Sequence, residues 1–513
     1  MLLSRPKCID FLTRLAKLIL ISYNFLLMRN DFFSAKKSTR PERVFLKTSE
    51  TGLRDKCGIF GIYGKGEDVA RISFFGLYSL QHRGQEGAGI TVTDGKNLKS
   101  VKGLGLVSTV FDEEKINSLK GFASIGHTRY STTGGNKLCN VQPVVLNLKN
   151  DVFALAHNGN IINAMDLAKK LPNNVKLSST NDTEIMGWVI KNSSGKNWEE
   201  KIFSSFKKFQ GAFSMIALTK NKLIAFRDTY GFRPLVLGQL NGSYIVCSET
   251  CALDTVGAKF VREVAPGEIV AIDEKGVYTV GKVPSSKKSF CLFEYVYLAR
   301  PDSIFNKQLV HQVRQRSGEI LSYESPVGAD LVVAVPDSGT SAAIGYSKAS
   351  GIPYGEVLIK NRYIGRTFIQ PEQHIREMGV KLKFNPLKKI VKGKRIIIVD
   401  DSIVRGTTMK KIIKILRGCG VKKIHIRVCS PPVTDPCYFG IDTPDKNRLI
   451  ASHMTVKEIE KFIGADSLAY LSLDGLKKAS RIKSNKLCTS CFDGKYPMPV
   501  EGGFRKDVFE TIN

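Results

Sequence analysis

Long apolar runs are missing from this chain of 513 residues. The best candidate, at residues 18–28, is interrupted by Ser22, Tyr23 and Asn24 and is too short to span a bilayer. Cysteine is also sparse: 11 residues without regular spacing do not build a small disulfide-bonded secreted scaffold, so a reducing compartment is expected. Hydrophobic residues make up 42% and charged residues 24%, which is typical of a folded globular protein rather than a disordered or polytopic membrane chain.

Acidic residues are in short supply, with 47 Asp and Glu against 77 Lys and Arg, so the formal net charge is +30. Such a charge attracts nucleic acid, acidic membranes or small phosphorylated ligands. The lysines are scattered rather than collected in one tract, and a solvated basic surface is the simpler interpretation. The charge is compatible with a polyanionic small molecule, and we expect no nucleic-acid partner and no stable membrane insertion.

The length predicts two domains or three, because one hydrophobic core rarely supports so long a chain. Residues 1–56 are interpreted as a leader or propeptide of unknown purpose that is removed, and a later translation start, for instance at Met28, is the alternative. The basic residues around the short apolar run suit an organelle presequence or an amphipathic surface helix. A cytoplasmic location is expected, and import into an organelle by this leader is the alternative.

Short apolar runs separated by glycine begin at residue 57, and helical stretches near residues 70–80 and 182–192 interleave with them. This texture predicts an α+β first domain over residues 57–284. The polar, turn-prone segment at residues 284–289 is the predicted linker.

A different pattern, strand then loop then helix, occupies residues 290–475. The runs at residues 331–335 and 395–399 are fully apolar, which predicts an α/β domain whose mainly parallel sheet is covered on both faces. Ligands of such sheets bind beyond the carboxyl ends of the strands, here the loops at residues 336–340 and 400–408. Residues 476–513 form a C-terminal segment.

The sharpest signal is the stretch at residues 396–408, IIIVDDSIVRGTT. A buried strand runs into two carboxylates, Asp400 and Asp401, and then into a glycine-containing turn and a helix that is expected to start near Met409. The free N–H groups at the start of that helix, with the hydroxyls of Thr407 and Thr408, predict an anion site. An ordinary βα turn is the alternative, and no Gly-Lys-Ser or Gly-Lys-Thr of a Walker A loop is present.

The whole stretch resembles the signature of type I phosphoribosyltransferases, which bind phosphoribosyl pyrophosphate (PRPP). The resemblance implies that Asp400 and Asp401 hold the ribose and contribute to a Mg²⁺ site together with Ser338, which lies in a loop similar to the family's pyrophosphate loop. It also implies a mobile flap whose cations contact PRPP. The implied phosphate and flap contacts are Ser402, Ile403, Val404, Arg405, Gly406, Thr407 and Thr408 in the loop, with Lys360, Arg362 and Arg366 in the flap.

Four segments of the first domain suggest a second chemistry: C-G-I-F-G-I at residue 57, H-T-R-Y-S-T-T-G at 127, H-N-G-N at 157 and S-T-N-D-T-E at 179. Their order resembles class II glutamine amidotransferases, which have the αββα fold of N-terminal-nucleophile hydrolases.

The resemblance implies that Cys57 is the catalytic residue and becomes the mature N-terminus. A free thiol, with a pKa of about 8.5, is mostly protonated at neutral pH. An α-amino group, whose pKa is about 8, can act as its base. It further implies that Arg129 binds the glutamine carboxylate, that Asp182 binds its amino group, and that Asn158 and the Gly159 N–H form the oxyanion hole. His127 and His157 are given structural roles.

Together, in this order, the two signatures are similar to the amidophosphoribosyltransferase family over residues 57–500. Membership implies a glycosyltransferase that transfers a pentosyl group and has glutaminase activity, making 5-phosphoribosylamine from glutamine and PRPP in the first step of purine synthesis. It also implies a homodimer or homotetramer inhibited by purine nucleotides. The competing interpretations are a class II amidotransferase with another ammonia acceptor and a purine-responsive nucleic-acid regulator.

The C-x-x-C pair of Cys488 and Cys491 is, by itself, equally compatible with redox chemistry, zinc or half of an iron–sulfur site. One branch of the family holds a [4Fe-4S] cluster, and the resemblance implies that Cys291 and Cys437 complete four thiolate ligands. A four-cysteine zinc site and simple packing residues are the alternatives. The expected cofactors are one Mg²⁺ and one cluster per subunit.

Overall fold

The structure, a computed structural model, describes residues 57–130, 135–148, 151–285, 287–361, 384–441, 443 and 445–500. The predicted leader at residues 1–56 lies outside them, as do residues 131–134 of the second glutamine motif and residues 501–513. Among the described residues, no helix has both the length and the apolar character needed to cross a membrane.

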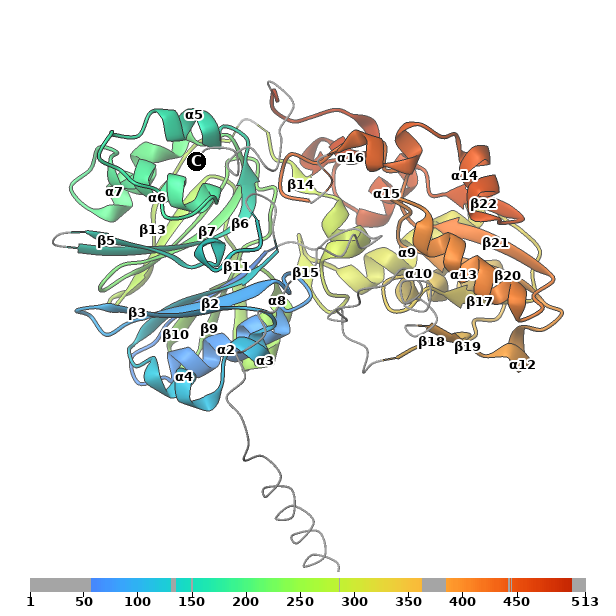
Figure 1. The fold of residues 1–513 in the computed structure, drawn as a ribbon, viewed down its shortest axis with the longest axis horizontal. Helices are drawn as coiled ribbons and strands as arrows, with labels where there is room; N and C mark the ends of the chain where they lie inside the picture. The colour runs from blue at the N-terminus through green and yellow to red at the C-terminus, as the bar shows by residue number, and fades with distance from the viewer. Residues whose placement is uncertain are drawn as a thin grey trace, which may run out of the picture. The chain divides into compact units, whose positions relative to one another are not determined.

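Two antiparallel sheets form the first domain (Figure 1). The seven-stranded sheet has the order β11 (Lys259–Glu263), β9 (Val236–Leu240), β10 (Ser243–Cys247), β1 (Gly58–Tyr63), β4 (Ala123–Arg129), β2 (Gly87–Thr93) and β3 (Leu98–Leu104). The six-stranded sheet has the order β13 (Gly276–Lys282), β12 (Glu268–Asp273), β8 (Leu223–Arg227), β7 (Gly211–Leu218), β6 (Asp151–Ile161) and β5 (Val144–Leu148). β1 lies between β10 and β4 and is buried at every position, so the residue before it starts at the centre of the sheet.

Helices cover the outer face of each sheet, while the inner faces pack on each other through small and branched residues such as Ile59, Ala154 and Ile216. The first sheet is covered by α2 (Val69–Ser79), α3 (Val107–Val110), α4 (Glu113–Ser118) and α8 (Thr250–Val256). The second sheet is covered by α5 (Ala164–Lys169), α6 (Asp182–Lys191) and α7 (Trp198–Ser205). This is the αββα arrangement that the glutamine motifs implied, and the helices expected near residues 70–80 and 182–192 are confirmed.

A four-stranded parallel sheet organises the second domain. Its order is β17 (Leu331–Ala334), β20 (Arg395–Asp400), β21 (Lys423–Val428) and β22 (Ser467–Tyr470). Val332 and Ile397 face the cluster formed with α9 (Val310–Glu324) and α10 (Thr340–Ser350). Val333 and Ile398 face the cluster formed with α13 (Thr407–Gly418) and α14 (Val456–Ile463). Successive strand residues therefore serve opposite faces, which explains the unbroken apolar runs in the sequence.

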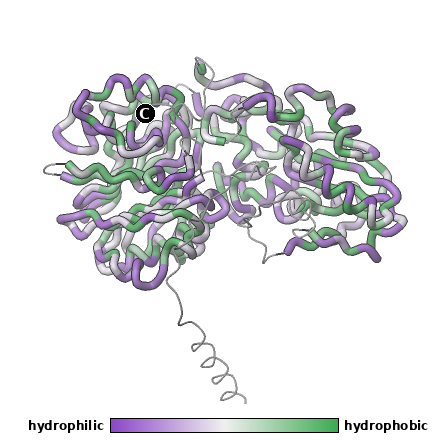
Figure 2. Tube along the Cα trace, in the orientation of Figure 1, coloured by the Kyte–Doolittle hydropathy of each residue, from purple (hydrophilic) through white to green (hydrophobic). Residues whose placement is uncertain are grey.

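Smaller elements complete the described chain. They are η2 (Phe206–Lys208), β14 (Phe290–Cys291), η3 (Glu294–Leu298), β15 (Ile304–Phe305), β16 (Gln308–Leu309), β18 (Leu358–Lys360), β19 (Phe384–Pro386), α12 (Lys388–Val391), α15 (Leu473–Ser480), β23 (Leu487–Cys488) and α16 (Ser490–Asp493), with short 3-10 turns at Leu138–Asn140, Lys446–Arg448, Ile450–Ser452 and Ser484–Lys486. β23 pairs with β14 in parallel, so the C-terminal segment joins the start of the second domain. In Figure 2 the central strands are largely hydrophobic and the peripheral loops hydrophilic, as the buried cores require.

Candidate active sites

Cys57 directly precedes β1 and is buried. Its Sγ–H donates to the Tyr130 carbonyl at 3.4 Å. Burial raises the pKa of the Cys57 thiol to about 11, and Asp182 also raises it, while the bond to Tyr130 and the charge of Arg129 lower it. The thiol is therefore protonated at neutral pH and would need a base before it could attack an amide.

Asn158 and Gly159 lie on β6, in the sheet that packs against the one containing β1. The Asn158 Nδ2 donates to Ser248 Oγ at 3.4 Å, and Ser248 Oγ also accepts from the Ile59 N–H at 3.0 Å. This bond links the amide to β1, two residues from Cys57. Gly159 has φ +155°, and a Cβ there would lie 1.9 Å from the Ala212 carbonyl oxygen, so only glycine fits.

Arg129 ends β4, and its guanidinium donates to the Asn140 and Gly135 carbonyls at 3.0 Å each. Asp182 begins α6, and its Oδ2 accepts from the Ile161 N–H at 3.1 Å. Burial acts to raise the pKa of Asp182, but His157 and the hydrogen bonds outweigh it and hold the pKa below its usual range. An ionised carboxylate suits a substrate ammonium group.

Both charges lie close enough to Cys57 to shift its pKa, so the structure brings together Cys57, Arg129 and Asp182. His157 lies beside them, with Nδ1 at 3.5 Å from Asp182 Oδ1. The structural role expected for this histidine thus becomes specific: it holds the carboxylate. His127 is also buried and bonds the His157 carbonyl at 3.2 Å, and burial lowers its pKa to about 3.

Asp400 ends β20 and Asp401 follows it, at the carboxyl edge of the parallel sheet. Asp401 is buried; its Oδ1 accepts from Ser402 Oγ at 2.5 Å, and Ser338 also bonds its carboxylate. Burial raises the pKa of Asp401, while these bonds and the charge of Arg314 lower it. Residues from two separate loops, at 338 and 401, therefore meet at one point.

The anion loop enters its helix sooner than expected, because α13 begins at Thr407 rather than near Met409. Gly406 is left-handed, with φ +72°, and its carbonyl accepts from the Lys410 N–H at 3.0 Å. Thr407 Oγ1 is buried and has no hydrogen-bond partner. A buried hydroxyl without a partner at a helix N-terminus fits an anion that would accept from it.

The side chains of Ile403 and Val404 are buried in the core, so any ligand contact from them must use the backbone. Across the site, Lys360 forms an ion pair with Asp337, whose side chain is 77% exposed. Arg362 and Arg366, the other predicted flap cations, lie outside the described residues.

The four predicted cluster cysteines lie near the start of the second domain, where Cys291 and Cys488 are partners in the β14–β23 pair. Burial raises the pKa of Cys437, which Arg233 lowers and the Cys291 thiol raises. Burial and the other three thiols raise the pKa of Cys491. Among the described residues, no three His, Cys, Asp or Glu side chains are close enough to hold a single metal ion.

A buried ionic network between the two domains was not found by sequence reasoning. Arg83 donates to Glu294 at 2.7 Å and pairs with Glu249, and Arg233 donates to Glu294 at 3.3 Å. All four side chains are at most 1% exposed. The buried Glu294 carboxylate is thus shared by two arginines of the first domain.

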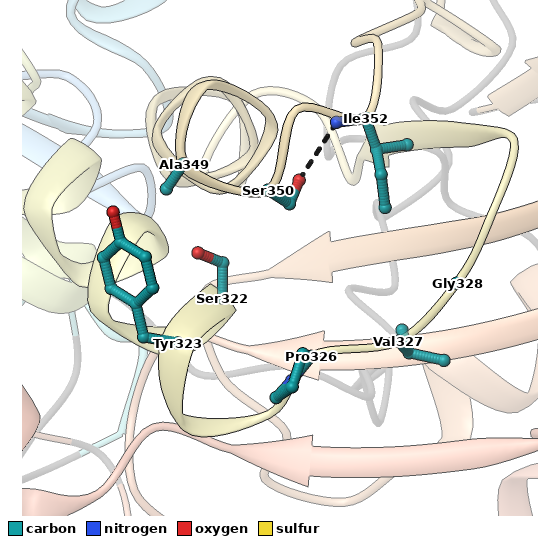
Figure 3. A pocket seen from close by; sticks show the side chains of 8 residues that line it. All are labelled: Ser322, Tyr323, Pro326, Val327, Gly328, Ala349, Ser350 and Ile352. Atoms are coloured by element: carbon teal, nitrogen blue, oxygen red, sulfur yellow. Dashed lines mark hydrogen bonds between the residues drawn. The ribbon is translucent and has the colours of Figure 1, made fainter.

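A hollow between the C-terminal ends of α9 and α10 is shown in Figure 3. It is lined by Ser322, Tyr323, Pro326, Val327, Gly328, Ala349, Ser350 and Ile352. Ser338 precedes the opposite, N-terminal end of α10, which is about 16 Å long for its 11 residues. The hollow is therefore separate from the PRPP loops.

Comparisons with known proteins agree with both halves. The glutamine amidotransferase domain family matches residues 127–255, and the phosphoribosyl transferase domain family matches residues 302–431. An amidophosphoribosyltransferase from Synechococcus elongatus is 49% identical over 469 residues, covering 89% of this chain and 95% of the relative. The chloroplastic amidophosphoribosyltransferase 1 of Arabidopsis thaliana is 47% identical, covering 87% of this chain and 80% of the relative.

Solved structures extend the agreement to three dimensions. The glutamine PRPP amidotransferase from B. subtilis complexed with ADP and GMP is 44% identical, with a TM-score of 0.81, and the match covers 86% of this chain and 98% of that one. A structure described as the allosteric regulatory enzyme of purine biosynthesis is also 44% identical, with a TM-score of 0.83, covering 88% and 99%. The chain belongs to the amidophosphoribosyltransferase family.

Proposed function

We propose that this chain makes 5-phosphoribosylamine by hydrolysing glutamine at Cys57 and passing the ammonia to C1 of PRPP, as the first step of purine synthesis. The observation that carries the proposal is that one chain of this family contains two groups of suitable residues: Cys57 with Arg129 and Asp182, and, in a single loop, the buried Asp401 and the unpartnered Thr407 hydroxyl.

In the glutaminase half, removal of residues 1–56 frees the α-amino group of Cys57, which takes the thiol proton. The Sγ attacks the side-chain amide carbon of glutamine, and the resulting oxyanion accepts from Asn158 Nδ2 and the Gly159 N–H. Arg129 binds the substrate carboxylate and Asp182 its ammonium. The Cys57 α-ammonium returns its proton to the departing nitrogen, so collapse expels ammonia and leaves a γ-glutamyl thioester, which water hydrolyses to glutamate and the free thiol.

In the transferase half, ammonia attacks C1 of PRPP as pyrophosphate leaves. Asp400 and Asp401 hold the ribose hydroxyls, while the backbone and hydroxyls of residues 402–408 hold the 5-phosphate. We propose that Lys360 contacts the pyrophosphate; the other predicted flap cations, Arg362 and Arg366, lie outside the described residues. The position of Lys360 beside Asp337 supports this, because the same ammonium could transfer from that carboxylate to the leaving group.

Mg²⁺ is proposed at Ser338, Asp400 and Asp401. The donor set fits, because Mg²⁺ binds hard oxygens and usually takes one or two carboxylates together with substrate phosphates rather than a full protein cage. The hydrogen bond from Ser338 to Asp401 supports the grouping. When bound, the ion would neutralise charge on the departing pyrophosphate.

A [4Fe-4S] cluster is proposed at Cys291, Cys437, Cys488 and Cys491. Cys291 and Cys491 are buried, and Cys437 and Cys488 are half-buried. The four thiols influence one another electrostatically, with the Arg233 guanidinium beside them. Four thiolates complete such a cluster, and a four-cysteine zinc site is the alternative.

The domain limits proposed are a removed leader at 1–56, a glutaminase domain at 57–284, a transferase domain at 290–475 and a C-terminal segment at 476–513. We propose a homodimer or homotetramer that purine nucleotides inhibit. The solved structure of the B. subtilis relative in complex with ADP and GMP supports the proposal that purine nucleotides bind.

The test is anaerobic purification followed by assay of phosphoribosylamine formation from glutamine and PRPP, with ammonium chloride as the alternative nitrogen donor. We expect synthesis with both donors, an N-terminus at Cys57, and about four iron and four sulfide per chain. Glutaminase activity without a PRPP-derived amine would point to another acceptor. Stoichiometric zinc in active, colourless protein would contradict the cluster. An intact leader on active protein would contradict the role of Cys57.

A further inference from the structure

Residues 436–441, which we call the bridging loop, connect the second domain to the glutaminase strands. The Asn160 Nδ2 donates to the Tyr438 carbonyl at 2.9 Å, and Arg233 Nε donates to the Phe439 carbonyl at 3.0 Å. The Phe439 ring stacks on Phe232, with ring centroids 4.4 Å apart and an interplanar angle of 16°. Two consecutive peptides of the loop are thus held by glutaminase side chains.

The next residue of the loop packs on the proposed oxyanion hole. Gly440 has φ +102°, and a Cβ built there would lie 3.0 Å from the Gly159 carbonyl carbon and 3.2 Å from its oxygen. A side chain at Gly440 would therefore crowd the Gly159 carbonyl, and a side chain at Gly159 would collide with the Ala212 carbonyl on its other side. Only two glycines allow the loop and β6 to lie this close together.

The start of the loop contains Cys437, one of the four proposed cluster cysteines. Cys437 Sγ accepts from the Ile441 N–H at 3.4 Å, so the loop folds back over its own cysteine. Arg233 holds the loop carbonyl and also the buried Glu294 at 3.3 Å, which ties the same peptide to the ionic network between the domains. The loop is anchored on both sides and has little freedom to relax.

We propose that Gly440 is a positioning residue for glutamine hydrolysis: the bridging loop lies against the Gly159 carbonyl and, through the Gly159 Cα, restricts the backbone dihedral angles that aim the Gly159 N–H at the oxyanion. The inference rests on the proposed function and assigns to the second domain a structural part in the first reaction. Its physical basis is that oxyanion donors act within about 2.7–3.1 Å of the charge that develops, so a small displacement of the donor removes its benefit. Displacements near about 1 Å can cost about 100-fold in rate.

The experiment compares Gly440→Ala with Gly276→Ala in the mature, cluster-loaded protein whose N-terminus is Cys57. Gly276 is the matched control, because its φ of +108° imposes similar backbone strain while the nearest atom to a Cβ is 4.0 Å away, in Tyr244. We expect Gly440→Ala to lower kcat for glutamine-dependent synthesis about 10- to 100-fold, with KM for glutamine changed less than about threefold. Ammonia-dependent synthesis and iron content should match those of Gly276→Ala.

A second variant guards against a folding defect in the first. Asn160→Asp is nearly isosteric but places an oxygen against the Tyr438 carbonyl in place of a donor, so it should weaken the same contact and give the same split between kcat and KM. Equal losses with glutamine and with ammonia in both variants would overturn the proposal, as would a Gly440→Ala protein indistinguishable from Gly276→Ala. A wild-type chain without glutamine-dependent synthesis would instead overturn the proposed function.

Discussion

The two candidate sites of this chain are built in opposite ways. Cys57, Arg129, Asn158 and Asp182 are at most 6% exposed and come from strands and a helix of one packed αββα core. The PRPP site lies on loops at the edge of a sheet, where Asp337 is 77% exposed and a hydroxyl of Thr407 is unpartnered. The first candidate site is preorganised by the fold, whereas the second leaves a polar group that we propose its polyanionic ligand satisfies.

This difference indicates which substitutions should impair each half of the reaction. Preorganised donors cost nothing to align when charge develops, but they depend on packing that extends far from the substrate. A ligand-completed site tolerates changes in distant packing and is sensitive to the loss of single ligand contacts. Substitutions can therefore separate the two halves.

The largest effect is expected from Cys57→Ala, which removes the nucleophile of the buried site. Glutamine-dependent synthesis should fall at least about 1,000-fold, while synthesis from ammonium salt stays near wild type because the second site is intact. Steady-state assays with both nitrogen donors measure this. Cys419→Ala serves as the control, since Cys419 is a buried cysteine outside both sites. Loss of both activities in a folded Cys57→Ala protein would contradict the separation.

Asp401→Asn should lower the rate of synthesis about 100-fold or more with either nitrogen donor. Ribose positioning and the charge near the metal serve both routes. Glutaminase activity measured without PRPP should persist. Asp474→Asn, a change at a carboxylate whose side chain is 85% exposed, is the control and should leave both activities unchanged. Wild-type synthesis in Asp401→Asn would refute the assigned site.

Glu249→Gln tests the buried charges that support the preorganised half. Burial acts to raise the pKa of Glu249, but Arg83 and His82 outweigh it and hold the pKa far below its usual range. Replacing one member of a buried pair leaves Arg83 undercompensated, so the free energy of unfolding at pH 7 should fall by about 3–5 kcal/mol.

The pH dependence of that loss has a definite sign. A depressed folded pKa contributes stability that is present above the unfolded value of about 4.5 and is lost as pH falls below it. Denaturant unfolding should therefore show that the free energy of unfolding of the wild type exceeds that of Glu249→Gln by less at pH 3.5 than at pH 7. Glu114→Gln, at an exposed position, should show no such advantage at either pH. A wild-type advantage that is constant with pH would contradict the ionic role.

The contrast between the sites also explains what sequence could predict. The loop at residues 400–408 and its helix were predicted because strand, turn and helix follow one another within a few residues, and each has a local pattern. Only the start of α13 differed, since the left-handed Gly406 begins the helix two residues early. The αββα fold followed from a resemblance carried by four short motifs rather than from periodicity.

The ionic network and the bridging loop could not be predicted in this way. Arg83 and Glu294 are 211 residues apart, and Asn160 and Tyr438 are 278 apart. Nothing local distinguishes a buried charge from a solvated one, because burial is decided by the domain that packs against it. Thr407 shows the same limit on a small scale: the motif identified the residue, but only the structure shows that its hydroxyl lacks a partner.

The smallest effect, and the sharpest test of a ligand-completed site, is expected from Thr407→Val. The substitution keeps the shape of the side chain and removes a buried hydroxyl that has no partner in the protein, so the free energy of unfolding should stay level or rise slightly. A hydrogen bond to a charged phosphate contributes about 1.5–3 kcal/mol, so KM for PRPP should rise at least about tenfold with both nitrogen donors. The control is Thr255→Val in α8, where the hydroxyl already donates to the Cys251 carbonyl at 2.8 Å. That change should lower stability without altering KM for PRPP. If Thr407→Val instead destabilised the protein and left KM unchanged, the hydroxyl would be part of the fold, and the PRPP site would be as preorganised as the glutamine site.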